Sequence, residues 1–164
     1  MARVRPEQPL VASVLDRLLD YQPHISREPP PKRHQVLSEL KQAVRRDLEN
    51  LLNTRVRCRP CPPGLKELEH SLANYGLPDF TGIATGADRA REEMRRRLEE
   101  IIRREEPRFK TVAVYKVDGA EPLDRTWRFR IEALLNVEPA PEPVVFDSVL
   151  KAVTGTFEVK GGEA

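Results

Sequence analysis

The sequence has no long apolar run, few aromatic residues and almost no excess of charge of either sign. No segment approaches the roughly 20 consecutive apolar residues that cross a bilayer, and Met1–Pro6 lacks the apolar stretch of a secretory signal. Aromatic residues make up 5% of the chain, which has 28 basic and 26 acidic residues. Because the charges nearly balance, they create no long-range electrostatic attraction to nucleic acid or membranes. We therefore expect a cytoplasmic protein that neither binds nucleic acid nor inserts into a membrane.

Residue patterns for metal, redox or covalent chemistry are also missing. Cys58 and Cys61 form a lone Cys-x-x-Cys pair, and the three histidines are not spaced to complete a zinc site, which needs four ligands. A thioredoxin-type site needs a βαβ context, which the neighbouring prolines oppose. We interpret the two cysteines as incidental loop thiols. The sequence has neither a phosphate-binding glycine loop nor a nucleophile motif, so no metal or cofactor is expected.

Prolines separate an N-terminal arm, residues 1–34, from a single domain over residues 35–164. The arm cannot fold alone, but residues 11–19 place apolar side chains on one helical face, as short docking helices do. This helix can dock on a partner or pack back on its own domain. The expected docking residues are Leu15, Asp16, Arg17 and Leu18.

Three further helices are predicted in the first part of the domain. Residues 35–52 carry an apolar stripe. Residues 64–75 form a shorter helix that buries Leu65, Leu68 and Leu72, with Gly76 as a left-handed stop. Residues 87–105 have a narrow apolar side and a charged one. Acid-first pairs spaced i,i+4 stabilise this last helix: Glu92–Arg96, Glu93–Arg97, Glu99–Arg103 and Glu100–Arg104.

Beyond residue 108 the apolar period changes from 3.6 to two, which indicates strands. Strands are predicted at 109–117 and 127–137, with shorter ones at 144–149 and 156–159. The second strand is long against a usual length of about 5–6 residues, so we expect one end to project and offer an edge. The predicted fold is α+β: N-terminal helices packed on a small antiparallel sheet with an edge open for strand addition.

Glu106, Pro107 and Arg108 stand where the last helix meets the first strand. Proline lacks a backbone donor and disfavours helix in the residue before it, so the corner is rigid. The acid–base pair on either side can hold the corner together or clamp a partner. Arg108 favours the ionised form of Glu106, which makes this residue a poor general acid. A glycosidase mechanism therefore has no support from the corner.

Four segments, in their order along the chain, resemble the TssE family. Members of this family are baseplate subunits of bacterial type VI secretion systems and are related to the sheath-initiator wedge proteins of contractile phages. The segments are residues 13–18, 46–55, 75–79 and 106–108. The resemblance covers most of residues 11–160. It implies a non-enzymatic assembly role without a cofactor. Some family members carry a lysozyme-like label, so the alternative function is a peptidoglycan-cleaving enzyme.

The resemblance also implies partners and contact residues. Family members sit in the inner-membrane-proximal baseplate beside the wedge proteins TssF and TssG, and they initiate the TssB–TssC sheath. TssK and the inner tube are further candidate neighbours. Glu106, Pro107 and Arg108 correspond to the motif that contacts the wedge's helical bundle. The family's sheet resembles the strand-accepting sheet of the sheath. Here the expected sheath-facing residues are Trp127, Arg128, Phe129, Arg130, Ile131 and Glu132.

Overall fold

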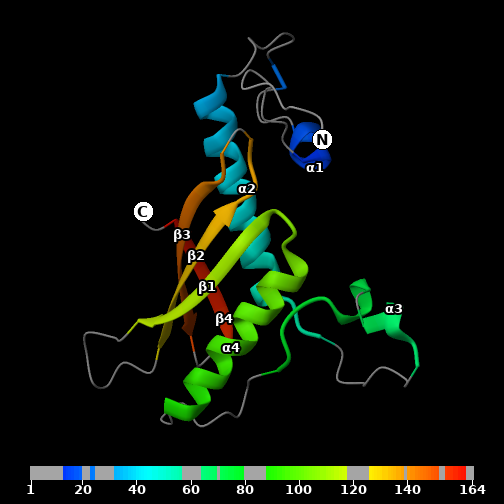
Figure 1. Cartoon of the computed structure of the whole chain (residues 1–164), viewed down its shortest axis with the longest axis vertical. Coiled ribbons are helices and arrows are strands. Elements are labelled where there is room, and N and C mark those ends of the chain that lie inside the picture. Colours follow the sequence, from blue (N-terminus) through cyan, green and yellow to red (C-terminus); the bar gives the residue numbers. More distant parts are fainter. Residues whose placement is uncertain are drawn as a thin grey trace.

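A four-stranded antiparallel sheet is the centre of the structure, a computed structural model (Figure 1). The structure describes residues 13–19, 23–24, 32–56, 64–69, 71–79, 88–117, 126–138, 140–151 and 154–161. The strands follow one another in space as in the chain, each antiparallel to the next. They are β1 (Phe109–Val117), β2 (Trp127–Leu135), β3 (Glu142–Lys151) and β4 (Thr156–Gly161).

Two long helices pack on the sheet, α2 (Arg33–Asn53) against β4 and α4 (Asp88–Glu105) against β1. Both bury their apolar stripes in the same core, so they cover one face of the sheet. Three shorter elements lie outside this layer (Figure 1). They are α1 (Val14–Leu18), α3 (Lys66–Glu69) and the 3-10 helix η1 (Leu72–Asn74). The predicted α+β class is confirmed.

Side-chain alternation in β2 shows how the sequence determines the two faces of the sheet. Every second residue is buried from Trp127 to Leu135, while Arg128, Arg130 and Glu132 are exposed. The same period places Val112 and Val114 of β1 in the core. Because the buried positions of neighbouring strands are in register, they form one continuous apolar surface beneath the helices.

The charged side of α4 carries most of the predicted ion pairs. Glutamate–arginine contacts of 2.8–3.2 Å are present at three of the four predicted i,i+4 spacings, Glu92–Arg96, Glu93–Arg97 and Glu99–Arg103. Arg104 instead contacts Glu105, its neighbour in sequence. Hydrogen bonds with Arg95 and Arg96 lower the pKa of Glu92 to about 2. Glu92 therefore stays ionised throughout the physiological range.

The predicted helix over residues 64–75 is wrong in its length and in its buried face. The helix ends at Glu69, and η1 follows after Ser71. The Leu68 carbonyl accepts hydrogen bonds from Ser71 Oγ at 2.8 Å and Asn74 Nδ2 at 2.9 Å. Such side-chain bonds to the backbone compete with helix continuation. Leu65 is 54% exposed and Leu72 is 89% exposed, so neither side chain lies on a buried face.

Gly76 lets the chain pass close to the end of α2. Its φ is +112°, and a Cβ at this position would lie 2.5 Å from the Thr54 carbonyl oxygen. The next residue, Leu77, donates its N–H to that oxygen at 2.8 Å and accepts from Val56 N at 2.9 Å. Residues 75–79 are thereby fixed against the residues that follow α2.

We expect Gly76→Ala to lower the free energy of unfolding by about 1–3 kcal/mol, because a left-handed backbone and a backbone clash coincide there. Thermal unfolding of the purified protein measures the loss. Gly161→Ala is the matched control, since a Cβ there meets nothing within 4 Å. An unchanged melting temperature for Gly76→Ala would contradict the predicted strain.

Candidate functional site

The corner between α4 and β1 is closed by a two-point ion pair. Glu106 N donates to Ile102 O at 2.9 Å, so the helical bonding continues one residue past α4. After Pro107, Arg108 turns back on Glu106 and donates from Nε to Oε1 at 2.6 Å and from Nη2 to Oε2 at 2.5 Å. Glu106 is 6% exposed, and both of its oxygens accept from Arg108. This bidentate geometry fixes the angle at which the strand leaves the helix.

Asp47 joins α2 to this corner. Arg108 Nη2 donates to Asp47 Oδ2 at 2.8 Å, although the two residues are 61 positions apart. The other oxygen, Oδ1, accepts from Arg46 Nε and Nη2, both at 3.1 Å. The bond to Glu106, the largest contribution, and the one to Asp47 raise the pKa of Arg108. The Asp47 carboxylate thus ties α2 to the corner at the end of α4.

The same chain of charges reaches α1. Arg46 Nη2 donates to Asp16 Oδ1 at 2.9 Å, and Ser13 Oγ donates to Asp16 Oδ2 at 2.5 Å. Burial alone would raise the pKa of Asp16, but the hydrogen bonds from Ser13 and Arg46 outweigh it and hold the pKa below its ordinary value. We call Asp16, Arg46, Asp47, Glu106 and Arg108 the corner cluster.

Tyr75 lies beside the corner cluster. Burial raises the pKa of its hydroxyl, and the negative charges of Asp47, Glu105 and Glu106 raise it further. All four segments that carry the family resemblance therefore contribute to this cluster or lie near it. Sequence reasoning singled out Glu106 and Arg108 but missed Asp47 and Arg46 as their partners. The only available signal was their place in one of those segments.

Of the two roles predicted for the corner, the structure shows the internal one: Arg108 and Glu106 bond each other. This arrangement does not suit a general acid, because the Glu106 oxygens accept from a cation. A partner would contact the surface atoms of the corner that the internal ion pairs do not use. Pro107 is exposed, and the hydrogen bonds of the described residues use Arg108 N, Nε and Nη2 but not Nη1.

The prediction that β2 offers an edge is wrong. From Trp127 to Leu135 it pairs with β3, and along Arg128–Leu135 it also pairs with β1. Of the predicted sheath-facing residues, Trp127, Phe129 and Ile131 are buried in the core. Periodicity identified the strand, but the edges of a sheet depend on strand order, which periodicity does not specify.

The outer edge of β1 is covered by side chains of α4. Arg95 Nη1 donates to Val114 O at 3.1 Å, and Val114 N donates to Glu99 Oε2 at 3.5 Å. Arg103 Nη2 donates to Val112 O at 3.4 Å. These residues also belong to the ion pairs of α4, so the charged helix side and the strand edge form one network.

The outer edge of β4 is covered in the same way by α2. Asn53 Nδ2 donates to Phe157 O at 2.9 Å, and Phe157 N donates to Asn53 Oδ1 at 2.8 Å. Arg45 Nη1 donates to Val159 O at 3.0 Å. A carboxamide that bonds both groups of one residue replaces the peptide of a neighbouring strand. The expected open edge is therefore absent along these described parts of β1 and β4.

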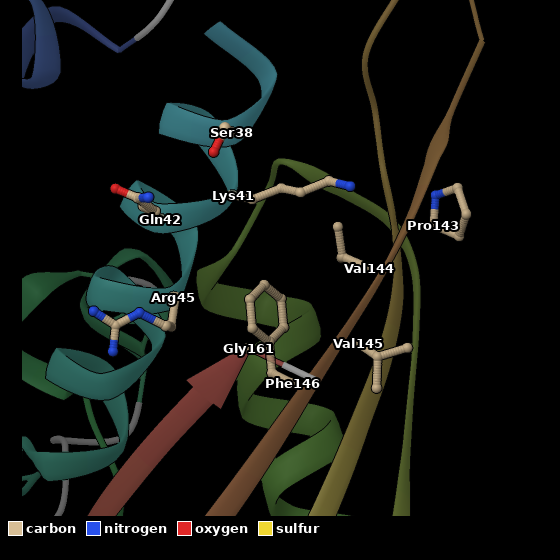
Figure 2. A pocket seen from close by; sticks show the side chains of 9 residues that line it. All are labelled: Ser38, Lys41, Gln42, Arg45, Pro143, Val144, Val145, Phe146 and Gly161. Carbon is tan, nitrogen blue, oxygen red and sulfur yellow. The ribbon is translucent and has the colours of Figure 1, made fainter. Parts of the chain in front are cut away.

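A groove of about 180 Å³ lies where β4 ends, between the first half of α2 and the start of β3. Gly161 pairs with Phe146, whereas Glu142–Val145 of β3 extend past the described end of β4. Figure 2 shows Val144 and Phe146 pointing toward α2, and Lys41 reaching across the groove. Lys41 Nζ contacts Glu142 Oε1 at 2.9 Å. By the alternation of the ladder, the N–H of Val145 faces this side.

Sites for other chemistry are not found in the described part of the chain. No group of three or more potential metal ligands occurs among the described residues. No described helix is long and apolar enough to cross a membrane. Cys58 and Cys61 lie outside the described residues.

The family described as baseplate wedge protein gp25 matches residues 38–140, more than half of the chain. The chain belongs to this family, which confirms the recognition of the TssE-type domain from the sequence. It is a component of a phage-like baseplate, from a family of structural proteins. Searches of curated proteins and of solved structures gave no match.

We expect the Asp16 carboxyl to titrate below its ordinary value of 3.8 in a pH series of carboxyl ¹³C shifts. A lowered pKa in the folded state means that the ion pair stabilises α1 at neutral pH and that this stabilisation is lost as the pH falls through the lowered value. Arg46→Ala should move the midpoint upward. The same midpoint in both proteins would show that Arg46 does not hold Asp16.

Proposed function

We propose that this protein links the wedge of a type VI secretion baseplate to the contractile sheath and initiates sheath assembly, in the cytoplasm near the inner membrane. The observation that carries the proposal is the corner cluster. Four segments scattered over residues 13–108 carry the resemblance, and all of them contribute to this cluster or lie near it. A surface formed by several separate segments of the chain is expected in a subunit that must dock on its partner at one fixed angle.

The wedge proteins TssF and TssG are the proposed partners of the corner. Arg108 holds Glu106 and Asp47 through Nε and Nη2, so Nη1 is the guanidinium nitrogen that can bond a helix-end carbonyl or a carboxylate of the wedge. Pro107 is exposed beside it and fixes the backbone. The internal ion pairs thus orient Arg108 for the partner, and the holding role and the clamping role are compatible.

The sheath proteins TssB and TssC are the proposed partners of the sheet. We assign strand addition to the backbone along Glu142–Val145, because side chains of α4 and α2 already bond the outer edge of β1 at Val112 and Val114 and that of β4 at Phe157 and Val159. A strand that continues the line of β4 would bond the outer side of β3. It would lie over the apolar floor formed by Val144 and Phe146.

We expect Arg108→Ala to abolish co-purification with TssF–TssG and to lower the melting temperature. The truncation leaves Glu106, which is 8% exposed as a side chain, without its cation. The stability loss should be about 2–3 kcal/mol, reduced from the value for a fully buried pair because Arg108 is 26% exposed.

Leu98→Ala is the control for that loss of stability. It opens a cavity in the core, where Leu98 is 1% exposed, and should cost about 2–5 kcal/mol without touching the corner. Wedge binding should persist in Leu98→Ala and be lost in Arg108→Ala. If both variants bind as the wild type does, the corner is structural and the proposed wedge contact is wrong.

We expect Val145→Pro to block sheath polymerisation from assembled baseplates while wedge assembly continues. Proline removes the N–H that faces the groove, and β3 already accommodates Pro143 two residues earlier. Val145→Thr is the matched control, because it keeps both the N–H and the branched side chain. Sheath growth at the normal rate with Val145→Pro would exclude strand addition at this position.

A further inference from the structure

The short helix α1 is attached to the domain by its polar side. None of its residues is buried, and Arg46 of α2 bonds Asp16, whose side chain is 14% exposed. Ser13 caps the helix through the Asp16 N–H at 3.2 Å and bonds the Asp16 carboxylate as well. Asp16 therefore both stabilises the first turn and joins α1 to the corner cluster.

The apolar side of α1 faces solvent. Val14 is 72% exposed, Leu15 57%, Leu18 75% and Leu19 41%. These four residues, here called the α1 face, account for four of the seven large exposed apolar side chains among the described residues. A surface helix normally buries this side on its own domain. A five-residue helix is also too short to be stable alone, so its attachment must hold it in place.

We propose that the Asp16–Arg46 ion pair fixes α1 with its apolar side outward, so that the α1 face docks into an apolar groove of a helical partner. The ion pair is the carrying observation, because it bonds a helix with no buried residue to α2 in an orientation that packing on its own domain would not select. A concentrated apolar patch on a heavily charged surface is typical of a protein-binding site.

The position and charge of the α1 face indicate which partner binds it. Asp16 shares Arg46 with Asp47, and Asp47 contacts Arg108, so the α1 face adjoins the corner cluster. Arg17 is exposed on α1, and Arg46 is 33% exposed beside it. An apolar helix edged by arginines complements a groove edged by carboxylates. This inference rests on the proposed function: the groove belongs to the wedge partner that contacts the corner.

The alternative is that α1 is an autoinhibitory segment, here called a strap, which covers the corner and is displaced when the partner binds. A strap is expected to bury its apolar side against the domain that it protects, since that burial is what holds it closed. The exposed fractions of Leu15 and Leu18 favour docking over a strap. The two devices predict opposite effects of breaking the ion pair.

The test measures the affinity of the full chain for purified TssF–TssG complex. Leu15→Ser combined with Leu18→Ser should weaken binding at least about tenfold, as loss of apolar anchors does, with an unchanged melting temperature. Leu72→Ser is the matched control, because this leucine is 89% exposed on another element, and it should bind normally. Asp16→Asn should weaken binding about three- to tenfold and speed amide exchange at residues 14–19 of the free protein.

Normal binding by the double leucine variant overturns the proposal, and tighter binding by Asp16→Asn shows that α1 is a strap instead. If the wild-type chain does not bind the complex, the proposed function fails, and amide exchange in the free protein still tests the ion pair. Unchanged exchange in Asp16→Asn would show that Asp16 does not fix α1. If the wild-type chain and the double leucine variant bind the complex equally well, this inference is refuted and the proposed function stands.

Discussion

Asp47 is the carboxylate on which the arrangement of the helices and the corner depends. Its two oxygens accept from Arg46 and Arg108, so it connects α2, the α4–β1 corner and, through Arg46, α1. Arg108 in turn holds Glu106, a carboxylate too enclosed to lack a cation. Charges alternate along this series, so each guanidinium lies between two carboxylates. Packing alone allows helices to slide along a sheet, whereas directional ion pairs at a corner fix both position and angle.

The sheet shows a second use of polar side chains. Edge strands expose backbone groups that pair indiscriminately, and proteins protect them with charges, bulges or covering elements. Here the helices that cover the core also reach around the sheet, with Arg95, Glu99 and Arg103 on β1 and Asn53 and Arg45 on β4. Among the described residues, no such bond covers the outer side of β3 at Val145, past the described end of β4. Under the proposed function such selective protection is needed, because an edge open along its whole length would also pair with other copies of the protein.

Local patterns determined what could be predicted from the sequence. The burial alternation of β2 and the apolar stripe of α4 depend on neighbours a few residues away, and both were predicted correctly. The contacts that make the candidate site join residues far apart: Asp47 with Arg108, and Asn53 with Phe157. Periodicity carries no information on such pairs or on strand order, which is why the edge predicted at β2 is wrong. The break after α3 was missed because Ser71 and Asn74 act on the backbone rather than through an apolar pattern.

The corner and the groove lie at the same end of the sheet. Phe109 at the start of β1 pairs with Leu135 at the end of β2, and Leu135 pairs with Glu142 at the start of β3. Arg108 O accepts from Asn136 N at 2.8 Å, so backbone bonds continue from the corner into this row. The connection from corner to groove therefore contains strand ladders and ion pairs but no long flexible segment among the described residues. Ladders resist bending within the sheet, so under the proposed function a wedge protein bound at Arg108 would also set the direction of a strand added beside Val145. This coupling follows from the register of three strands, and it gives a structural protein a means of transmitting an angle from one assembly to the next.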